Sequence, residues 1–374
     1  MSQRDRDAAH PPPARSCRAV AASACAILPA VALIAGALPA YAGETDWALR
    51  LEDLAEGRGG DPLRVVGVFA IWENDGAYVK PIDDADRHYT NGLKIDLALR
   101  GGPIPRIMSA LPGFGAFEDP RFGGGVALTQ LMFTGFDISE PDPPEGDRPY
   151  AGHLGLTFYG QRSDRWKLDH AEIQLGVLGP LSGAQAVQTF VHSAVPRQTK
   201  PRGWSTQLND EPTINAGFIR RWRTPRAEIA MLEAELIPEL GARVGTVRTS
   251  VDAGLTARIG LFLPDDFGSP TSISAFRDVA GSWGDGTGQD WGVYAFARAG
   301  ASFKAHDVFL DGNVFSNSRS VDKRHAVAEA QVGVVGRYGK LELGYALTFK
   351  TQEFANQRGT DSFGSFFAGL IFEF

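Results

Sequence analysis

The feature of this sequence that most constrains its fold is a strict alternation of apolar and polar residues, repeated in segment after segment. In segment 93–100, aliphatic residues take every second position and charged residues stand only between them. Segments 340–350 and 171–177 follow the same rule. A period of two is the spacing of a β-strand with one apolar and one polar face. The sequence therefore predicts a protein built from many such strands.

Two folds can use strands of this kind. In a membrane β-barrel the apolar face meets lipid, whereas in a soluble β-sandwich it packs on a second sheet. Beyond the N-terminal segment, no apolar run reaches the roughly 20 residues that a membrane helix needs. The chain also ends on an alternating strand, 366–374, with Phe374 last, an ending common in outer-membrane barrels. We therefore expect an all-β fold, a transmembrane antiparallel β-barrel in the bacterial outer membrane.

The first 42 residues have the pattern of an export signal. Arg15 and Arg18 precede a long run of small and apolar residues, and Ala40-Tyr41-Ala42 follows as a cleavage site. A membrane-anchoring helix is the alternative, but prolines interrupt the run. We expect residues 1–42 to be removed and residues 43–374 to form the barrel.

Both cysteines, Cys17 and Cys25, lie in this removable segment, so the mature chain is expected to contain neither disulfides nor thiolate sites. Removing the segment takes away four arginines and two aspartates, a net of +2, so the formal charge of -7 becomes -9. An acidic chain of this kind does not suggest a nucleic-acid partner. The sequence carries no signal for the oligomeric state.

The alternating segments number about twelve, an even count, as in single-chain bacterial barrels. They lie near residues 64–74, 89–100, 125–134, 151–162, 168–178, 213–224, 228–245, 250–263, 291–306, 324–338, 340–353 and 363–374. With both chain ends in the periplasm, the extracellular loops become 75–88, 135–150, 179–212, 307–323 and 354–362. Two segments, 101–124 and 264–290, are longer than a periplasmic turn should be, and we interpret them as inserted loops or errors of boundary.

One stretch of the loop 179–212 lacks strand alternation and predicts a short helix. Gln185, Gln188 and His192 are spaced by three and four residues, so they share one helical face. Small and apolar residues share another face: Ala184, Val187, Val191 and Ala194. We expect the apolar face to lean on the barrel and His192 to point at the rim. The alternative is a surface helix whose histidine is merely solvated.

Four further polar residues near strand ends are candidates for chemistry. Asn74 and Asp75 before a glycine suit a hard cation such as Ca²⁺, or they form an ordinary turn at the end of a strand. Thr90 could be a hydroxyl ligand or a strand residue that faces the lumen. Arg148 could meet a phosphate or a sugar, or it could pair with a loop carboxylate.

No Gly-x-Ser-x-Gly motif occurs in the chain, so a hydrolase built on it has to activate water rather than a serine. A histidine acting as general base, with Ca²⁺ polarising an ester carbonyl, would suffice for that chemistry.

Taken together, these motifs resemble those of the outer-membrane lipid A 3'-O-deacylase family. The likeness rests on Asn74-Asp75, Tyr89-Thr90-x-Gly92, Gly146-Asp147-Arg148, Gly179-Pro180 with Gly183-x-Gln185-x-Val187-Gln188-x-x-x-His192, and Gly203-Trp204-x-x-Gln207. The family is a twelve-stranded barrel that hydrolyses the ester holding the acyloxyacyl chain at the 3' position of lipid A, with Ca²⁺. The resemblance implies that the substrate is lipopolysaccharide in the outer leaflet.

Residue roles follow from the same resemblance. It implies that His192 is the general base, that Asp75 is a Ca²⁺ ligand, and that Asn74, Thr90 and Gln188 complete the site. The family pattern also has a lysine in the second outer loop, and a glutamate and a tyrosine soon after the histidine. This sequence has no lysine in its second loop and lacks that glutamate and tyrosine, which leaves open a relative that acts on another acyl position or glycolipid.

Two other classes of function remain as alternatives. An outer-membrane phospholipase is disfavoured because no recognisable motif places a serine beside the histidine. A structural or transport barrel would have no need of a histidine on a helical face above Asn74 and Asp75.

Overall fold

The computed structural model describes residues 61–75, 88–111, 115–194, 199–268, 272–274, 278–279 and 290–372. The predicted export signal and the terminal Phe374 lie outside the described residues. The strands are β1 (Arg64–Asn74), β2 (His88–Arg100), β3 (Arg121–Thr134), β4 (Ala151–Ser163), β5 (Lys167–Leu178), β6 (Glu211–Trp222), β7 (Ala227–Ile229), β8 (Leu232–Gly245), β9 (Arg248–Leu261), β10 (Trp291–Asp307), β11 (Ala326–Tyr338), β12 (Leu341–Lys350) and β13 (Asp361–Ile371). The helices are α3 (Ile104–Ala110), η1 (Pro180–Ser182), α4 (Ala184–Ala194), η2 (Gly203–Thr206) and α5 (Val308–Asp311).

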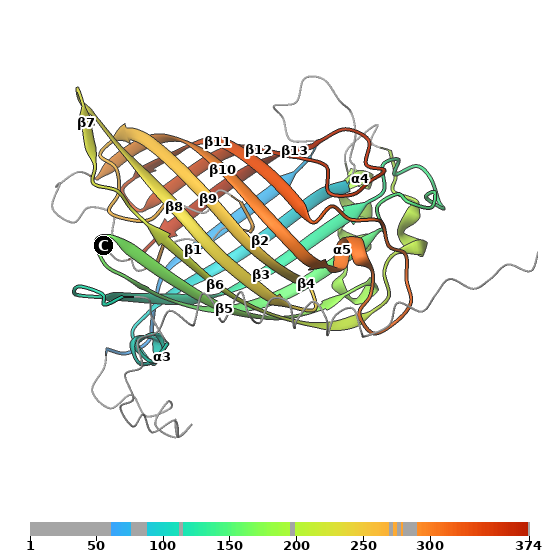
Figure 1. Ribbon diagram of the computed structural model, residues 1–374, viewed down its shortest axis with the longest axis horizontal. Helices are drawn as coiled ribbons and strands as arrows, with labels where there is room; N and C mark the ends of the chain where they lie inside the picture. The colour runs from blue at the N-terminus through green and yellow to red at the C-terminus, as the bar shows by residue number, and fades with distance from the viewer. Residues whose placement is uncertain are drawn as a thin grey trace, which may run out of the picture. The chain divides into compact units, whose positions relative to one another are not determined.

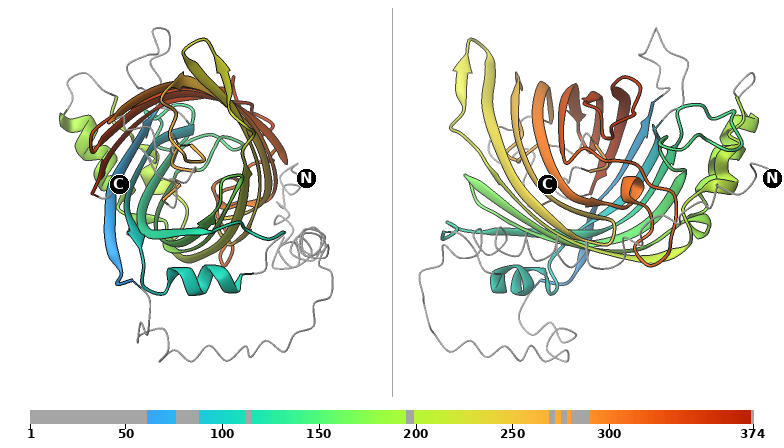
Figure 2. Two further views of the ribbon diagram at one scale, coloured as in Figure 1. Left: turned by 90° about the vertical axis from the view of Figure 1, so that its left-hand side faces the viewer. Right: turned by 45° about the vertical axis from the view of Figure 1, so that its right-hand side comes forward.

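Twelve strands form one closed antiparallel barrel (Figures 1 and 2). Neighbouring strands pair from β1 to β6 and from β8 to β13, and the pairs β1–β13 and β6–β8 close the ring. The short β7 pairs with β8 and extends the hairpin beyond the ring (Figure 1). The all-β barrel of about twelve strands is therefore confirmed.

The two faces of the strands differ as the alternation predicted. In β2, Leu93, Ile95 and Leu97 are exposed on the outside, whereas Asp96 and Ala98 are buried on the inside. Closing a sheet in this way removes its edges and leaves an apolar outer surface that fits lipid. Among the described residues, no helix has the length and apolar content needed to span a membrane.

Two of the predicted boundaries were wrong. The expected strand 228–245 is broken by a turn, because Ala230 adopts a left-handed φ of 57° before β8 begins. The expected loop 101–124 contains α3, and β3 already begins at Arg121. Arg162 donates hydrogen bonds to the carbonyl oxygens of Met108 and Leu111 and so fastens this helix to β4.

The segment after β9 folds into the lumen, so the expectation of an inserted loop at 264–290 holds for its described part (Figure 2, left view). The backbone N–H of Ile273 donates to Glu73 Oε1 at 2.7 Å, and that of Val279 donates to Gln161 Oε1 at 2.8 Å. Both apolar side chains join a cluster with Phe69 and other residues that point inward. The described part of this segment thus reaches from the end of β9 to Glu73, near the end of β1 that leads into the first long loop.

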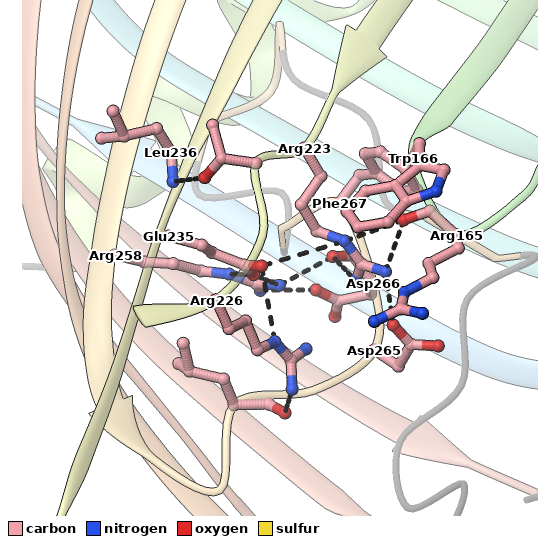
Figure 3. Close-up of polar contacts among 12 residues, drawn as sticks. Arg165, Trp166, Arg223, Arg226, Glu235, Leu236, Arg258, Asp265, Asp266 and Phe267 are labelled. Carbon is pink, nitrogen blue, oxygen red and sulfur yellow. Dashed lines mark hydrogen bonds and ion pairs between the residues drawn. The ribbon is translucent and has the colours of Figure 1, made fainter. Parts of the chain in front are cut away.

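A cluster of charged side chains lies where β8, β9 and the segment after β9 meet (Figure 3). Arg258 is fully buried between Glu235 and Asp266, and Arg223 pairs with Asp265 at 2.6 Å. Buried charges of this kind need partners, and here each cation has a carboxylate within reach. Ion pairs therefore occupy this part of the lumen.

A second ionic cluster closes the opposite end, where the long loops lie. Arg148 Nη1 and Lys304 Nζ each lie 2.7 Å from the carboxylate of Glu353, and Lys304 also contacts Asp307. Arg148 therefore pairs with a loop carboxylate, the second of the two alternatives that its sequence context left open. Burial acts to raise the pKa of Glu353, but the two cations outweigh it and hold that pKa well below its usual range.

Candidate active site on the outer face of the barrel

The predicted loop helix is α4, and it packs on the barrel by a face turned by roughly a quarter of a turn from the expected one, with Ala184 common to both. Gln188 and His192 are 4% and 7% exposed, so their side of the helix is covered. Val187 and Val191 are about half exposed, and Gln185 is exposed as well. The prediction that the apolar face leans on the barrel was therefore wrong, because it treated water as the only alternative to the barrel.

The surface under α4 is the outer face of β3 and β4. Met132 packs against Ala184 and Trp204, whereas its neighbour Leu131 packs against the lumen clusters. Because successive strand residues point to opposite faces, Met132 points outward. A side chain at Gly152 would collide with Ser182 and Ala184, so the glycine allows the helix to lie close to β4.

Gln188 is fixed by the segment that follows the helix. The indole N–H of Trp204 in η2 donates to Gln188 Oε1 at 2.7 Å, and Trp204 stacks edge-to-face on Tyr150. Gln188 Nε2 is buried and makes no hydrogen bond within the described residues. The amide is thus oriented, and the hydrogen-bonding capacity of Nε2 is not used within the described residues.

The same following segment orients His192. Its ring Nδ1 lies 2.7 Å from the carbonyl oxygen of Thr199. A carbonyl oxygen can only accept a hydrogen bond, so Nδ1 carries the proton and the lone pair of the neutral ring lies on Nε2. This tautomer is the one in which Nε2 can act as a base.

The second group of predicted residues gathers around Thr90. Asn74 Nδ2 donates to the carbonyl oxygen of Thr90 at 3.1 Å, and the backbone N–H of Asp75 donates to the same oxygen at 3.4 Å. The pairing of β2 with β3 shifts by one residue here, so Thr90 is the extra residue of a β-bulge. Asn74, Asp75 and Thr90 therefore lie together at the loop end of β1 and β2.

The bulge also connects this group with the surface under α4. Thr90 Oγ1 lies 2.7 Å from Thr134 Oγ1, and Thr134 stands two residues after the outward-pointing Met132 on β3. The hydroxyl of Thr90 is thus directed to the outer face, which disfavours the lumen-facing alternative. Thr134 carried no sequence signal as a site residue, because its position opposite Thr90 depends on a register shift.

Comparison with known families identifies the family to which this chain belongs. The family model described as "Outer membrane protein LpxR" matches residues 28–372. The chain belongs to the LpxR family. The resemblance drawn from the sequence motifs is confirmed by this match, and the chain is an integral outer-membrane protein. The search of curated proteins found no match.

A solved structure of an LpxR protein has the same fold. LpxR from Salmonella typhimurium superposes with a TM-score of 0.64 and 18% identity, over 82% of this chain and 100% of that chain. The β-domain of the Bordetella autotransporter BrkA has a TM-score of 0.37 and 14% identity, over 84% of this chain and 99% of that chain.

The donor chemistry of this LpxR family member suits a hard cation. The described residues hold no group of three or more His, Cys, Asp or Glu side chains that could bind a metal ion. Calcium, however, also accepts amide, hydroxyl, carbonyl and water oxygens. Asp75, Asn74 and Thr90 offer oxygen donors of these kinds, so they fit the ion by donor type.

Proposed function

We propose that this protein is an outer-membrane ester hydrolase that removes the acyloxyacyl chain from the 3' position of lipid A. Membership of the LpxR family supports the class of substrate. The absence of a serine elbow from the sequence supports direct attack by water.

One observation carries the proposal: α4, which bears Gln188 and His192, lies on the outer face of the barrel, the side that meets lipid. An enzyme whose substrate diffuses in the outer leaflet needs its catalytic groups on that side. A channel would instead present its specific groups to the lumen, where Arg258 is held in ion pairs with Glu235 and Asp266.

His192 supplies the acid–base chemistry in this proposal. Nε2 takes a proton from water, the resulting oxygen nucleophile attacks the ester carbonyl, and the alkoxide that leaves takes the proton back from Nε2. The products are a free fatty acid and an alcohol on lipid A, so atoms and charge balance. The hydrogen bond from Nδ1 to Thr199 keeps the ring in the required orientation throughout.

The other residues position the substrate. Gln188 Nε2 is a donor that can meet the ester carbonyl, and Trp204 holds the amide in the required orientation. Asp75, Asn74 and Thr90 would hold Ca²⁺. When bound, the ion would polarise the ester carbonyl and stabilise the negative charge that develops on its oxygen.

A direct assay separates this function from that of a phospholipase. The purified barrel, in detergent with Ca²⁺, is incubated with lipid A and, in a parallel reaction, with a phosphatidylethanolamine. We expect mass spectrometry to show loss of one acyloxyacyl unit from lipid A and an unchanged phospholipid. Release of fatty acid from the phospholipid alone would contradict the proposal.

A further inference from the structure

The exposed surface of α4 is divided into two chemically different stripes. With 100° of rotation per residue, Gln185, Thr189 and Ser193 fall on one side of the buried face, and all three are exposed and polar. On the other side lie three exposed apolar residues: Val187 (42% exposed), Phe190 (73%) and Val191 (45%). The helix therefore has three faces, one for the barrel, one polar and one apolar.

A helix that meets only barrel and water would place its apolar residues against the barrel. In α4 the barrel covers Gln188 and His192 instead, and the apolar stripe is left outside. Such a stripe beside a polar one is the pattern of a helix that lies at a membrane surface. We call Val187, Phe190 and Val191 the apolar stripe.

The apolar stripe is continuous with the lipid-facing surface of the barrel. On the outer face of β3, Leu128 is 46% exposed, Gln130 binds the carbonyl oxygen of Ser182, and Met132 lies beneath α4. At about 3.3 Å per strand residue, Leu128 and Met132 are about 13 Å apart along the strand. The helix is thus attached to the outer face of the barrel at the loop end of its lipid-exposed band.

We propose that the apolar stripe inserts among the acyl chains of the outer leaflet. The occupant is lipid hydrocarbon, because the helix rests on the surface that already meets lipid and not on the mouth of the lumen. In a lipid, the ester groups lie where hydrocarbon gives way to polar headgroups. A helix seated at that depth holds His192 at the level of the ester bond.

The membrane contact stands by itself, whereas its link to catalysis rests on the proposed function. The contact can be measured without activity, because the mature chain is expected to contain no cysteine. Single cysteines are placed by Val187→Cys and Phe190→Cys, with Gln185→Cys and Thr189→Cys as controls on the polar stripe. Each variant carries a nitroxide label and is reconstituted in phospholipid vesicles that contain lipopolysaccharide.

We expect the labels at 187 and 190 to collide with oxygen, which concentrates in hydrocarbon, and to be shielded from a water-soluble nickel chelate. The labels at 185 and 189 should behave in the opposite way. Equal accessibility to nickel at all four positions would overturn the proposal. Spin–spin broadening at 190 would also overturn it, because a second copy of the chain would then cover the stripe.

A kinetic experiment tests the link to catalysis. Phe190→Asp places a charge in the apolar stripe, and Thr189→Asp places the same charge one residue away on the polar stripe. With lipid A in vesicles, we expect Phe190→Asp to raise KM about tenfold with kcat unchanged, since removing a large apolar side chain from lipid weakens binding by at least that factor. Thr189→Asp should leave both constants unchanged.

Equal effects of these two substitutions would contradict the link to catalysis. If the labels report lipid but no variant of the protein hydrolyses lipid A, the membrane contact stands and the proposed function fails. If lipid A is hydrolysed while the labels report water, the proposed function stands and the membrane contact fails.

Discussion

His192 is the side chain on which the proposed hydrolysis depends most directly. Replacing it with alanine removes the base that accepts the proton of water, and such a loss costs roughly 10²- to 10⁴-fold in rate. We expect His192→Ala to lower kcat by that factor while the barrel still shows the gel mobility shift of a folded outer-membrane protein. Gln185→Ala, at an exposed position of the same helix, is the matched control and should keep the full rate.

A folded His192→Ala protein with near-native turnover would show that the histidine is not the base. Its contact with Thr199 would then serve only to hold the loop after α4.

Asp75 belongs to a different step, because it is expected to hold Ca²⁺ rather than to move a proton. We expect EDTA to abolish hydrolysis and Ca²⁺ to restore it. Asp75→Ala should lose most activity, and part of it should return at high Ca²⁺, whereas no Ca²⁺ concentration should rescue His192→Ala. A titration of Ca²⁺ against rate checks both variants. Full activity in EDTA would refute the role of the metal.

The residues of the candidate site could be predicted only in part. Asn74, Asp75 and Thr90 do gather at adjacent strand ends, as their positions in the sequence suggested. Thr134 could not be predicted, because it meets Thr90 only through a bulge that shifts the register of β2 against β3. Whether a strand contains such an extra residue is not visible in its alternation.

Among the structural elements, the helix α4 shows how a correct prediction of secondary structure can give the wrong orientation. Its spacing of polar residues correctly indicated a helix. The predicted orientation of its faces was wrong. The usual rule assumes that a helix contacts only protein and water, and so it places the apolar face on the protein. In α4 the face with Gln188 and His192 is the buried one, and in the proposed membrane contact lipid is a third surrounding of the helix.

The loop between β12 and β13 carries a prediction about stability. Glu353 pairs with Arg148 and Lys304, and Lys304 also pairs with Asp307, so Glu353→Gln leaves the buried Arg148 without the carboxylate that it contacts. Breaking a buried ion pair in this way costs about 3–5 kcal/mol. We expect the variant to unfold at a lower temperature at pH 7, measured as the temperature at which the folded band disappears from a gel.

The pH dependence of this difference follows from the lowered pKa of Glu353. Its carboxylate stabilises the fold at every pH above the ordinary glutamate pKa of about 4.3, and that stabilisation is lost as the pH falls through the lower pKa of the folded state. The difference in unfolding temperature between Glu353→Gln and the unmodified protein should therefore be largest at pH 7. It should shrink only in strong acid. A difference that already vanishes between pH 7 and pH 5 would contradict this account.

For the whole molecule, the alternation of residues was enough to predict a closed barrel of about twelve strands. It could not predict where the segment after β9 goes, because a segment without alternation carries no signal for the lumen. Ile273 reaches Glu73 across about 200 positions of sequence, and only the folded barrel brings them together. The sequence likewise did not show that the candidate site faces lipid rather than the lumen.

The central claim is that this barrel deacylates lipid A with groups on its outer face, and lipid A taken from living cells tests it most directly. A Gram-negative host expresses either the unmodified protein or His192→Ala, with equal amounts of folded barrel in the outer membrane. Mass spectrometry of the extracted lipid A should show the loss of one 3'-linked acyloxyacyl unit with the unmodified protein only. An unchanged lipid A profile in cells that carry the folded, unmodified protein would contradict the account.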